Sequence, residues 1–235
     1  MSKITIAIDG FSSTGKSTIA KQLAKHLGYI YVDTGAMYRA VTLYAMQNTF
    51  VSPDAFYKEA LISSLNDIKI TFQFNEQLGF AEVFLNGKNV EKAIRTLEVS
   101  SYVSKVAAVT EVRQKLVEQQ QEMGKNKGVV MDGRDIGTVV FPNAELKLFM
   151  TASAEKRAER RFKELSDKGD AVTYEAVLKN VEERDYLDTT RKDSPLVKAI
   201  DAIEIDNSHF SLEEQFDKVL KLSEDKIKEV NGSIG

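Results

Sequence analysis

Residues 10–18 read GFSSTGKST, with four residues between the two glycines and a lysine and a serine directly after the second glycine. This spacing is typical of a loop that wraps its backbone N–H groups around phosphate. Glycine permits the tight turn, and a following helix adds its positive N-terminal end. We therefore predict that a nucleoside triphosphate binds here, at Gly10, Phe11, Ser12, Ser13, Thr14, Gly15, Lys16, Ser17 and Thr18.

Three side chains at the end of this loop have separate predicted tasks. Lys16 bridges the terminal phosphates, Ser17 offers its hydroxyl to Mg²⁺, and Thr18 makes a further phosphate contact. The alternative is a glycine-rich turn without a ligand. An apolar run before the loop and a helical pattern after it favour the phosphate loop, because that motif requires a strand and a helix on its two sides.

A second segment with residues suited to chemistry is VVMDGRDIG at 129–137, which places Asp132 at the end of an apolar run. A carboxylate at the C-terminal edge of a parallel sheet can bind Mg²⁺ through water, so Ser17 and Asp132 are the predicted metal ligands. Arg134 and Asp135 project from the same edge. The alternative is that Asp132 or Asp135 caps a helix or forms a turn.

Arginines are grouped at two further places in the chain. Arg157, Arg160 and Arg161 have the spacing i, i+3 and i+4, so one helix face can present all three guanidinium groups to an anion. The alternative is a solvated face that three neighbouring acids neutralise, namely Glu155, Glu159 and Glu164.

Arg184, Asp188 and Arg191 have the spacing i, i+4 and i+7, which aligns them along one side of a helix that continues that far. The arginines can grip a phosphate in a bidentate manner, and the aspartate can accept a sugar hydroxyl or orient an arginine. The alternative is an ordinary surface ion pair.

The composition of the 235 residues, with a net charge of −3, is that of a soluble globular protein with one folding unit. We expect no nucleic acid or membrane partner, a monomer, and a cytoplasmic location. The chain has no cysteine and two separated histidines, so disulfides and a protein-built zinc site are not expected.

The hydrophobic pattern predicts an α/β fold. The continuous run at 3–9 is typical of a parallel strand buried on both faces, and the runs at 29–33, 129–131 and 146–150 with the short segment 202–206 complete a set of four to five strand candidates. Helical periodicity covers 16–27, 36–48, 96–109, 110–124, 152–168, 174–187 and 212–230. The stretch 68–87 alternates around a short polar turn, which predicts an inserted antiparallel hairpin.

The segments DGFSSTGKST, DTGAMYR, IRTLEVSSYVSKVAAVTEVR, VVMDGRDIGTVVFPNA and ERDYLDTTR, in this order and spacing, resemble the bacterial cytidylate kinases. These are CMP/dCMP kinases of the P-loop nucleoside monophosphate kinase family, and the resemblance spans nearly the whole chain. It implies one domain over 1–235 with a five-stranded parallel sheet flanked by helices. Its implied parts are a core (about 1–35, 110–152 and 200–235), an acceptor-binding insertion (about 36–109) and a helical lid (about 153–192).

The resemblance implies transfer of the γ-phosphoryl group from ATP, with Mg²⁺, to CMP or dCMP. It assigns Thr34, Tyr38 and Arg39 to the acceptor pocket and Ser104, Arg113 and Asp135 to the cytosine. It assigns the acceptor phosphate or ribose to Arg134, Arg184, Asp188 and Arg191. The implied catalytic residues, lid arginines included, are Lys16, Asp132, Arg157, Arg161 and Arg184.

Three positions depart from the usual family sequence: Phe11 stands where many relatives carry proline, Ser17 where they carry glycine, and Thr34 where serine is common. None of these changes removes a phosphate donor. The acceptor, a phosphate monoester, is already largely ionised near neutral pH, so no strong general base is required. The remaining alternatives are a P-loop kinase for UMP, AMP or a sugar, and a nucleotide-dependent switch without an acceptor.

Overall fold

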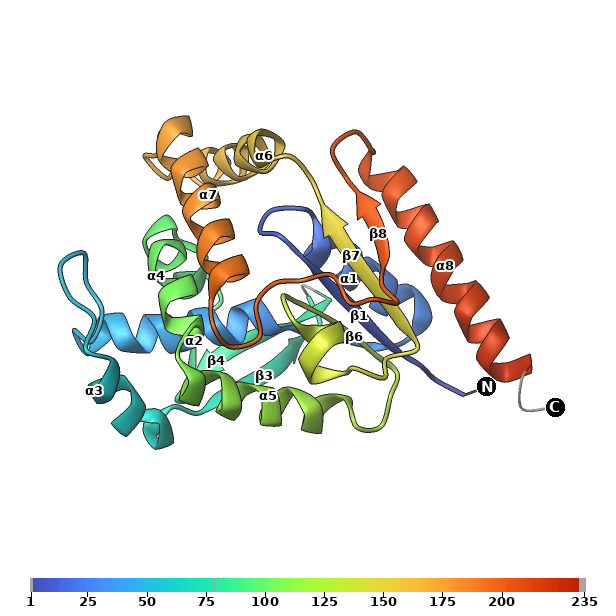
Figure 1. Ribbon diagram of the computed structural model, residues 1–235, viewed down its shortest axis with the longest axis horizontal. Coiled ribbons are helices and arrows are strands. Elements are labelled where there is room, and N and C mark those ends of the chain that lie inside the picture. The colour runs from blue at the N-terminus through green and yellow to red at the C-terminus, as the bar shows by residue number, and fades with distance from the viewer. Residues whose placement is uncertain (1, 78, 233–235) are drawn as a thin grey trace.

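The computed structural model describes residues 2–77 and 79–232, and its centre is a five-stranded sheet (Figure 1). The strands lie in the order β2-β6-β1-β7-β8, and every neighbouring pair is parallel. Their bounds are β1 Thr5–Gly10, β2 Ile30–Asp33, β6 Val129–Gly133, β7 Leu146–Thr151 and β8 Ile203–Asp206. The predicted fold class and the five predicted strands are confirmed.

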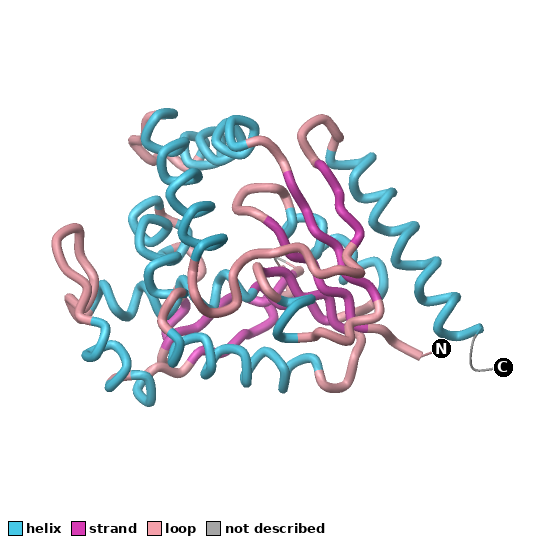
Figure 2. Tube along the Cα trace, in the orientation of Figure 1, coloured by secondary structure: helices cyan, strands magenta, loops and turns pink. Residues whose placement is uncertain are grey.

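The central strand β1 is buried on both faces of the sheet. Ile6 and Ile8 pack against α1 (Lys16–Leu27) and α8 (Leu212–Gly232) on one face. Ala7 belongs to a second buried cluster on the other face. Figure 2 shows the magenta strands of this sheet enclosed by cyan helices. Burial on both sides explains why the sequence of the strand is continuously apolar rather than alternating.

The segment between β2 and β6 forms a subdomain with its own core. Leu61, Val83 and Ile94 are among its fully or almost fully buried residues. Its antiparallel sheet has three strands in the order β3-β4-β5, one more than the predicted hairpin. Its elements are α2 Thr34–Gln47, α3 Lys58–Ser63, β3 Ile70–Asn75, β4 Phe80–Leu85, β5 Lys88–Asn89, α4 Leu97–Ala107 and α5 Thr110–Gly124.

Two charged helices, α6 (Ala154–Asp167) and α7 (Tyr174–Thr190), follow β7 and pack on each other (Figure 1). Their shared apolar cluster includes Ala158 and Val177, both fully buried. Helix α7 also contacts α4, so this pair lies between the end of the main sheet and the inserted subdomain. In the described part of the chain, no helix combines the length and the apolar character needed to cross a membrane.

Several elements differ from the sequence-based prediction in ways that have a local cause. Helix α2 starts at Thr34 rather than 36, because the Asp33 side chain accepts the N–H of Ala36 and caps the helix. Helix α7 continues to Thr190, so it aligns Arg184 with Asp188 as predicted, whereas Arg191 is the extended residue that ends the helix. The short helix α3 and a π-helical segment, Ile136–Val140, carry too few turns to show a helical period.

We expect Gly10→Ala to destabilise the fold far more than Gly28→Ala, although both glycines have positive φ. An added Cβ at Gly10 (φ +141) would lie 2.0 Å from the Met150 carbonyl oxygen, whereas nothing lies within 4 Å at Gly28 (φ +64). Strain alone costs about 1 kcal/mol at Gly28, and strain plus overlap about 3 kcal/mol or more at Gly10. Thermal unfolding of both variants measures this, and equal losses would contradict the packing described for the loop.

Candidate active site

The loop at 10–18 leaves β1 at Gly10 and enters α1 at Lys16. Ser13 (φ 57) and Gly15 (φ 94) both adopt left-handed backbone conformations within it. Gly15 precedes the first helical residue, contributes no side-chain cap, and no acidic residue lies in the first turn of α1. The first N–H groups of α1 therefore point into the loop, where they can bind an anion together with the positive end of the helix.

Lys16 lies inside the loop and is 5% exposed. Its ammonium donates to the Phe11 carbonyl and lies 3.3 Å from Thr14 Oγ1, while Asn207 Nδ2 holds the Thr14 carbonyl at 2.5 Å. Burial and the nearby positive charge of Arg134 hold the pKa of Lys16 well below its ordinary value. A phosphate beside Lys16 favours the charged ammonium, so this site is electrostatically suited to an anion.

Asp132 is 4% exposed and lies beside the loop, because β6 is the neighbour of β1. Its carboxylate accepts the Ser17 hydroxyl at 2.9 Å and the Tyr31 hydroxyl at 2.8 Å. Burial, followed by the charge of Asp33, raises the pKa of Asp132 to about 6. These hydrogen bonds show that Asp132 does not cap a helix or close a turn.

The oxygen atoms of Ser17 and Asp132 are the hard donors that Mg²⁺ prefers, and they face each other across the loop. In residues 2–77 and 79–232, no three His, Cys, Asp or Glu side chains are grouped closely enough to hold a metal ion by themselves. The residues therefore fit a Mg²⁺ ion that takes its remaining ligands from phosphate and water.

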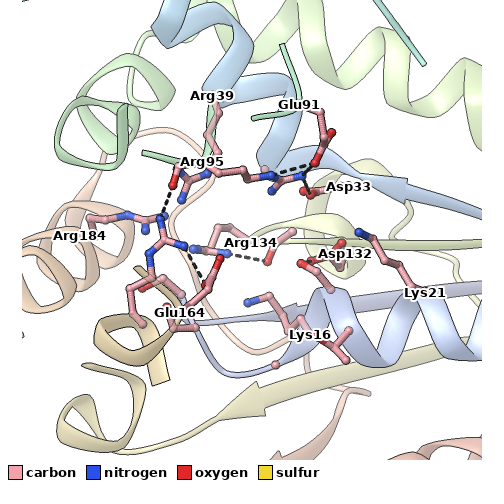
Figure 3. Close-up of a pocket in the computed structure, with 18 of the residues that line it drawn as sticks. Lys16, Lys21, Asp33, Arg39, Glu91, Arg95, Asp132, Arg134, Glu164 and Arg184 are labelled. Atoms are coloured by element: carbon pink, nitrogen blue, oxygen red, sulfur yellow. Dashed lines mark hydrogen bonds and ion pairs between the residues drawn. The ribbon is translucent and has the colours of Figure 1, made fainter. Parts of the chain in front are cut away.

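A cavity of ≈ 420 Å³ opens in front of the loop, between the main sheet, the inserted subdomain and α6–α7. Figure 3 shows Lys16, Arg134 and Arg184 reaching toward it from three different elements. Eight basic side chains line it, against four acidic ones, although the whole chain carries a net charge of −3. The basic residues are Lys16, Lys21, Arg39, Arg95, Arg134, Arg161, Lys168 and Arg184, and the acidic ones are Asp33, Glu91, Asp132 and Glu164.

Two arginines in this cavity are unfavourably placed for carrying charge. Burial and the adjacent Arg134 lower the pKa of Arg184 to about 10. Burial and the charge of Arg184 also hold the pKa of Arg39 well below its ordinary value. Nearby phosphate relieves this repulsion directly, because an opposite charge favours the ionised form of each arginine.

A second cavity adjoins the first and shares Gly35, Arg39, Gly133, Arg134 and Arg184 with it. The structure brings together at this second cavity all ten residues that the sequence assigned to the acceptor. These are Thr34, Tyr38, Arg39, Ser104, Arg113, Arg134, Asp135, Arg184, Asp188 and Arg191.

Asp188 is the centre of a polar network in the second cavity. It accepts the Ser104 hydroxyl at 2.8 Å and Arg134 Nε at 2.9 Å, and Arg191 Nη1 lies 3.7 Å away. Burial acts to raise the pKa of Asp188, but Arg134 and Arg184 outweigh it and hold the pKa below its ordinary value. Asp188 is therefore a buried carboxylate that keeps three cationic or hydroxyl groups in place, rather than part of an exposed surface pair.

Asp135 and Arg113 form a buried ion pair at the other end of the same cavity, each with a side chain only 4% exposed. The Arg113 guanidinium also donates to the Ala107 carbonyl at 3.1 Å and lies 5.3 Å from the Tyr38 ring centre. Asp135 makes no side-chain cap for the π-helical segment that follows it, so the capping alternative is wrong for this residue as well.

The three arginines of α6 do not share one anion site, contrary to the sequence-based expectation. Arg157 pairs with Asp185 at 2.5 Å, and Arg160 Nη2 donates to the Asn207 carbonyl at 2.6 Å. Only Arg161 lines the first cavity, where it donates to the Arg95 carbonyl at 2.7 Å. The reason is that the three side chains reach different segments: Arg157 reaches α7, Arg160 the residue after β8, and Arg161 the inserted subdomain.

The alternative, a solvated face on which neighbouring acids neutralise the arginines, holds for only part of α6. Arg161 pairs with Glu164 at 2.8 Å, and Glu159 pairs instead with Lys156 at 2.8 Å. Arg157 is 4% exposed, and its guanidinium lies 5.1 Å from the Phe11 ring centre. It lines neither cavity, although its Nη1 reaches the Ser12 carbonyl of the phosphate loop at 3.5 Å.

Several residues that line the first cavity were not predicted from the sequence. Arg95 forms ion pairs of 2.8 Å with both Asp33 and Glu91. Asp33 could have been found, because it ends a strand at the same sheet edge as Asp132 and is its register partner. Arg95 and Glu91 have no such signal, since the folding of the inserted subdomain places them here.

A glycine-rich loop at the end of a parallel sheet, joined to a second basic cavity through shared arginines, defines a P-loop kinase. A family model of cytidylate kinase matches residues 6–225. A cytidylate kinase of Flavobacterium johnsoniae is 72% identical over 97% of this chain and 99% of its own length. One of Flavobacterium psychrophilum is 70% identical over 94% and 98%, and one of Porphyromonas gingivalis is 52% identical over 98% of each chain. The chain belongs to the cytidylate kinase family.

Inorganic tripolyphosphate is expected to raise the midpoint of thermal unfolding, because it offsets the excess positive charge of the first cavity. The stabilisation is about 2.7 kcal/mol at a concentration 100 times Kd, and it shrinks at high salt. Lys16→Ala should lose most of this shift. Lys25→Ala is the matched control, since Lys25 is an exposed residue of α1 outside the cavity. Equal shifts in both variants would contradict phosphate binding at the loop.

Proposed function

We propose that this protein transfers the γ-phosphoryl group of ATP to CMP or dCMP, giving ADP and CDP or dCDP for pyrimidine nucleotide metabolism. Membership of the cytidylate kinase family supports this activity. The observation that carries the proposal is that two cavities, one on the phosphate loop and one lined by the acceptor residues, meet at Arg39, Arg134 and Arg184. A phosphoryl group can therefore pass between two bound nucleotides without leaving this basic junction.

On the donor side, the loop at 10–18 holds the phosphates of ATP and Lys16 contacts the terminal ones. Ser17 and Asp132 hold Mg²⁺, which offsets phosphate charge when it is bound. The 2.9 Å contact between their oxygen atoms supports this assignment. Phe11 lies in this loop and Thr18 in the first turn of α1, so both belong to the proposed ATP site.

On the acceptor side, we assign the base to the end of the cavity that contains Arg113 and Asp135. Cytosine presents an amino donor next to two acceptors, which is complementary to a carboxylate placed beside hydroxyl and guanidinium donors. Ser104 supplies the hydroxyl. Asp188, Arg134 and Arg191 then hold the ribose and phosphate, a role that their shared hydrogen-bond network supports.

The transfer itself depends on position and charge rather than on a general base, because the attacking phosphate oxygen is already ionised. Lys16, Arg161 and Arg184 face the junction and stabilise the charge that spreads over the moving group. Arg157 acts differently: its pairing with Asp185 and its reach to the Ser12 carbonyl support a role in holding the loop.

The three structural units support a division of labour. We assign the main sheet to ATP, the inserted subdomain to CMP, and α6–α7 (residues 153–192) to a lid that excludes water, which suppresses ATP hydrolysis. We further propose that the protein works as a monomer in the cytoplasm, where both nucleotides are available, and needs no nucleic acid or membrane partner. Sedimentation of the purified chain tests the oligomeric state.

ADP formation measured with a panel of nucleoside monophosphates tests acceptor selectivity. CMP should exceed UMP in kcat/KM by ~10² or more, because uracil places a carbonyl oxygen against the Asp135 carboxylate. In Asp135→Asn this ratio should fall by about tenfold or more, since an amide can turn its N–H toward that carbonyl. Asp170→Asn, at an exposed position, should leave the ratio unchanged. Equal use of CMP and UMP by the unaltered protein would refute the base assignment.

Arg184→Gln should lower kcat by ~10³ without lowering the unfolding temperature. The pKa of Arg184 lies below its ordinary value, so its charged form opposes folding at neutral pH, and removing it relieves repulsion from Arg134. Lys179→Gln on the same helix is the control, because the Lys179 side chain is 77% exposed. The kcat and the thermal unfolding curve are measured for both variants. A stable Arg184→Gln variant with near-normal kcat would contradict the role given to the junction.

A further inference from the structure

Asp9 is a buried acid that belongs to neither cavity. It lies in β1 directly before Gly10 and is 4% exposed. Its Oδ1 accepts the backbone N–H of Ile136 at 2.8 Å, and its Oδ2 accepts that of Gly137 at 2.7 Å. Each carboxylate oxygen therefore binds one of two consecutive N–H groups at the start of the π-helical segment Ile136–Val140.

The residue immediately before that segment is Asp135, which is the position where an aspartate usually caps its own helix. Here it makes no side-chain cap, and its carboxylate instead forms the buried ion pair with Arg113. A cap at Asp135 would bind the N–H group of Gly137 or Thr138, and the Gly137 group is already satisfied by Asp9 from the adjacent strand. Capping from another strand thus leaves the Asp135 carboxylate available to the second cavity.

We propose that Asp9 is a positioning residue for base recognition, which fixes the Asp135 carboxylate in the acceptor cavity by capping the segment Ile136–Val140. The proposal rests on the proposed function, in which Asp135 recognises cytosine. Asp9 touches no substrate in this account. It acts by holding the backbone at 135–137 against β1.

The packing around Gly137 supports this role. A Cβ added at Gly137 would lie 3.3 Å from Asp9 Oδ2 and 3.0 Å from Lys147 Cδ, so the backbone approaches the carboxylate closely. Burial raises the pKa of Asp9 to about 7, and the two N–H bonds act against that shift. An ionisable group in so dry a position is unfavourable by itself, and the paired N–H donors are the contacts that compensate for it.

The test is Asp9→Asn, which keeps the shape but replaces one acceptor oxygen by an NH₂ group. One of the two N–H groups then faces a donor and loses its partner, so the segment shifts. We expect KM for CMP to rise about tenfold, with KM for ATP changed by less than about twofold. The preference for CMP over UMP should fall by about the same factor as the rise in KM for CMP.

Glu145→Gln is the matched control, because Glu145, like Asp9, is an acid whose side chain accepts a backbone N–H and joins β1 to another segment. Its Oε2 accepts the N–H of Thr5 at 2.8 Å, at the opposite end of the strand from Asp9. The same change of a carboxylate to an amide there should leave the CMP and ATP constants and the CMP preference unchanged. A general weakening of β1 would affect both variants alike, whereas a positioning role affects only Asp9→Asn.

Gly137→Ala supplies a second route to the same readout if Asp9→Asn does not fold. Its Cβ pushes against the Asp9 carboxylate, and it should raise KM for CMP selectively. The proposal is overturned if the folded variant changes both KM values equally, or lowers kcat alone, or keeps the CMP preference. If instead the unaltered protein forms no ADP in response to CMP, the proposed function has failed, and that result is distinct from the loss of selectivity measured in the variants.

Discussion

Uncompensated positive charge at one edge of the main sheet is the constraint on which the rest of the structure depends. The two adjoining cavities bring lysine and arginine side chains together with too few acids to neutralise them, in a chain whose overall charge is negative. Burial and nearby cations lower the pKa values of Lys16, Arg39 and Arg184, so the protein alone does not offset their positive charge. Two bound polyanions offset this charge, so we expect the cavities to be more stable when they are occupied.

The fold tolerates this repulsion because its apolar cores lie elsewhere. β1 is buried on both faces and fixes the start of the phosphate loop, while β6 beside it delivers Asp132 and the segment that carries Arg134 and Asp135. The inserted subdomain and the α6–α7 pair each have a separate apolar cluster, so they bring their arginines to the junction as packed units. Neighbouring strands of one sheet therefore support both cavities.

The sequence predicted those features that depend on local pattern. Short, mostly apolar segments predicted the five strands, and the glycine spacing at 10–18 predicted a loop between a strand and a helix, because both signals come from residues close together in the chain. The acceptor residues, such as Arg113 and Ser104, were found through the family resemblance, since no local pattern marks them. The partners of Arg157 and Arg160 were not predictable, because they depend on where α6 lies relative to segments that are distant in the sequence. The same holds for Asp9, whose partners lie more than 120 residues away.

The most direct test of this account is a crystal structure with a bisubstrate analogue in which a polyphosphate chain joins adenosine to cytidine. We expect the adenosine-linked phosphates to lie on the N–H groups of residues 10–18, the polyphosphate chain to cross the junction beside Arg134 and Arg184, and the cytosine to contact Asp135. A polyphosphate bound away from residues 10–18, or a cytosine outside the second cavity, would contradict it.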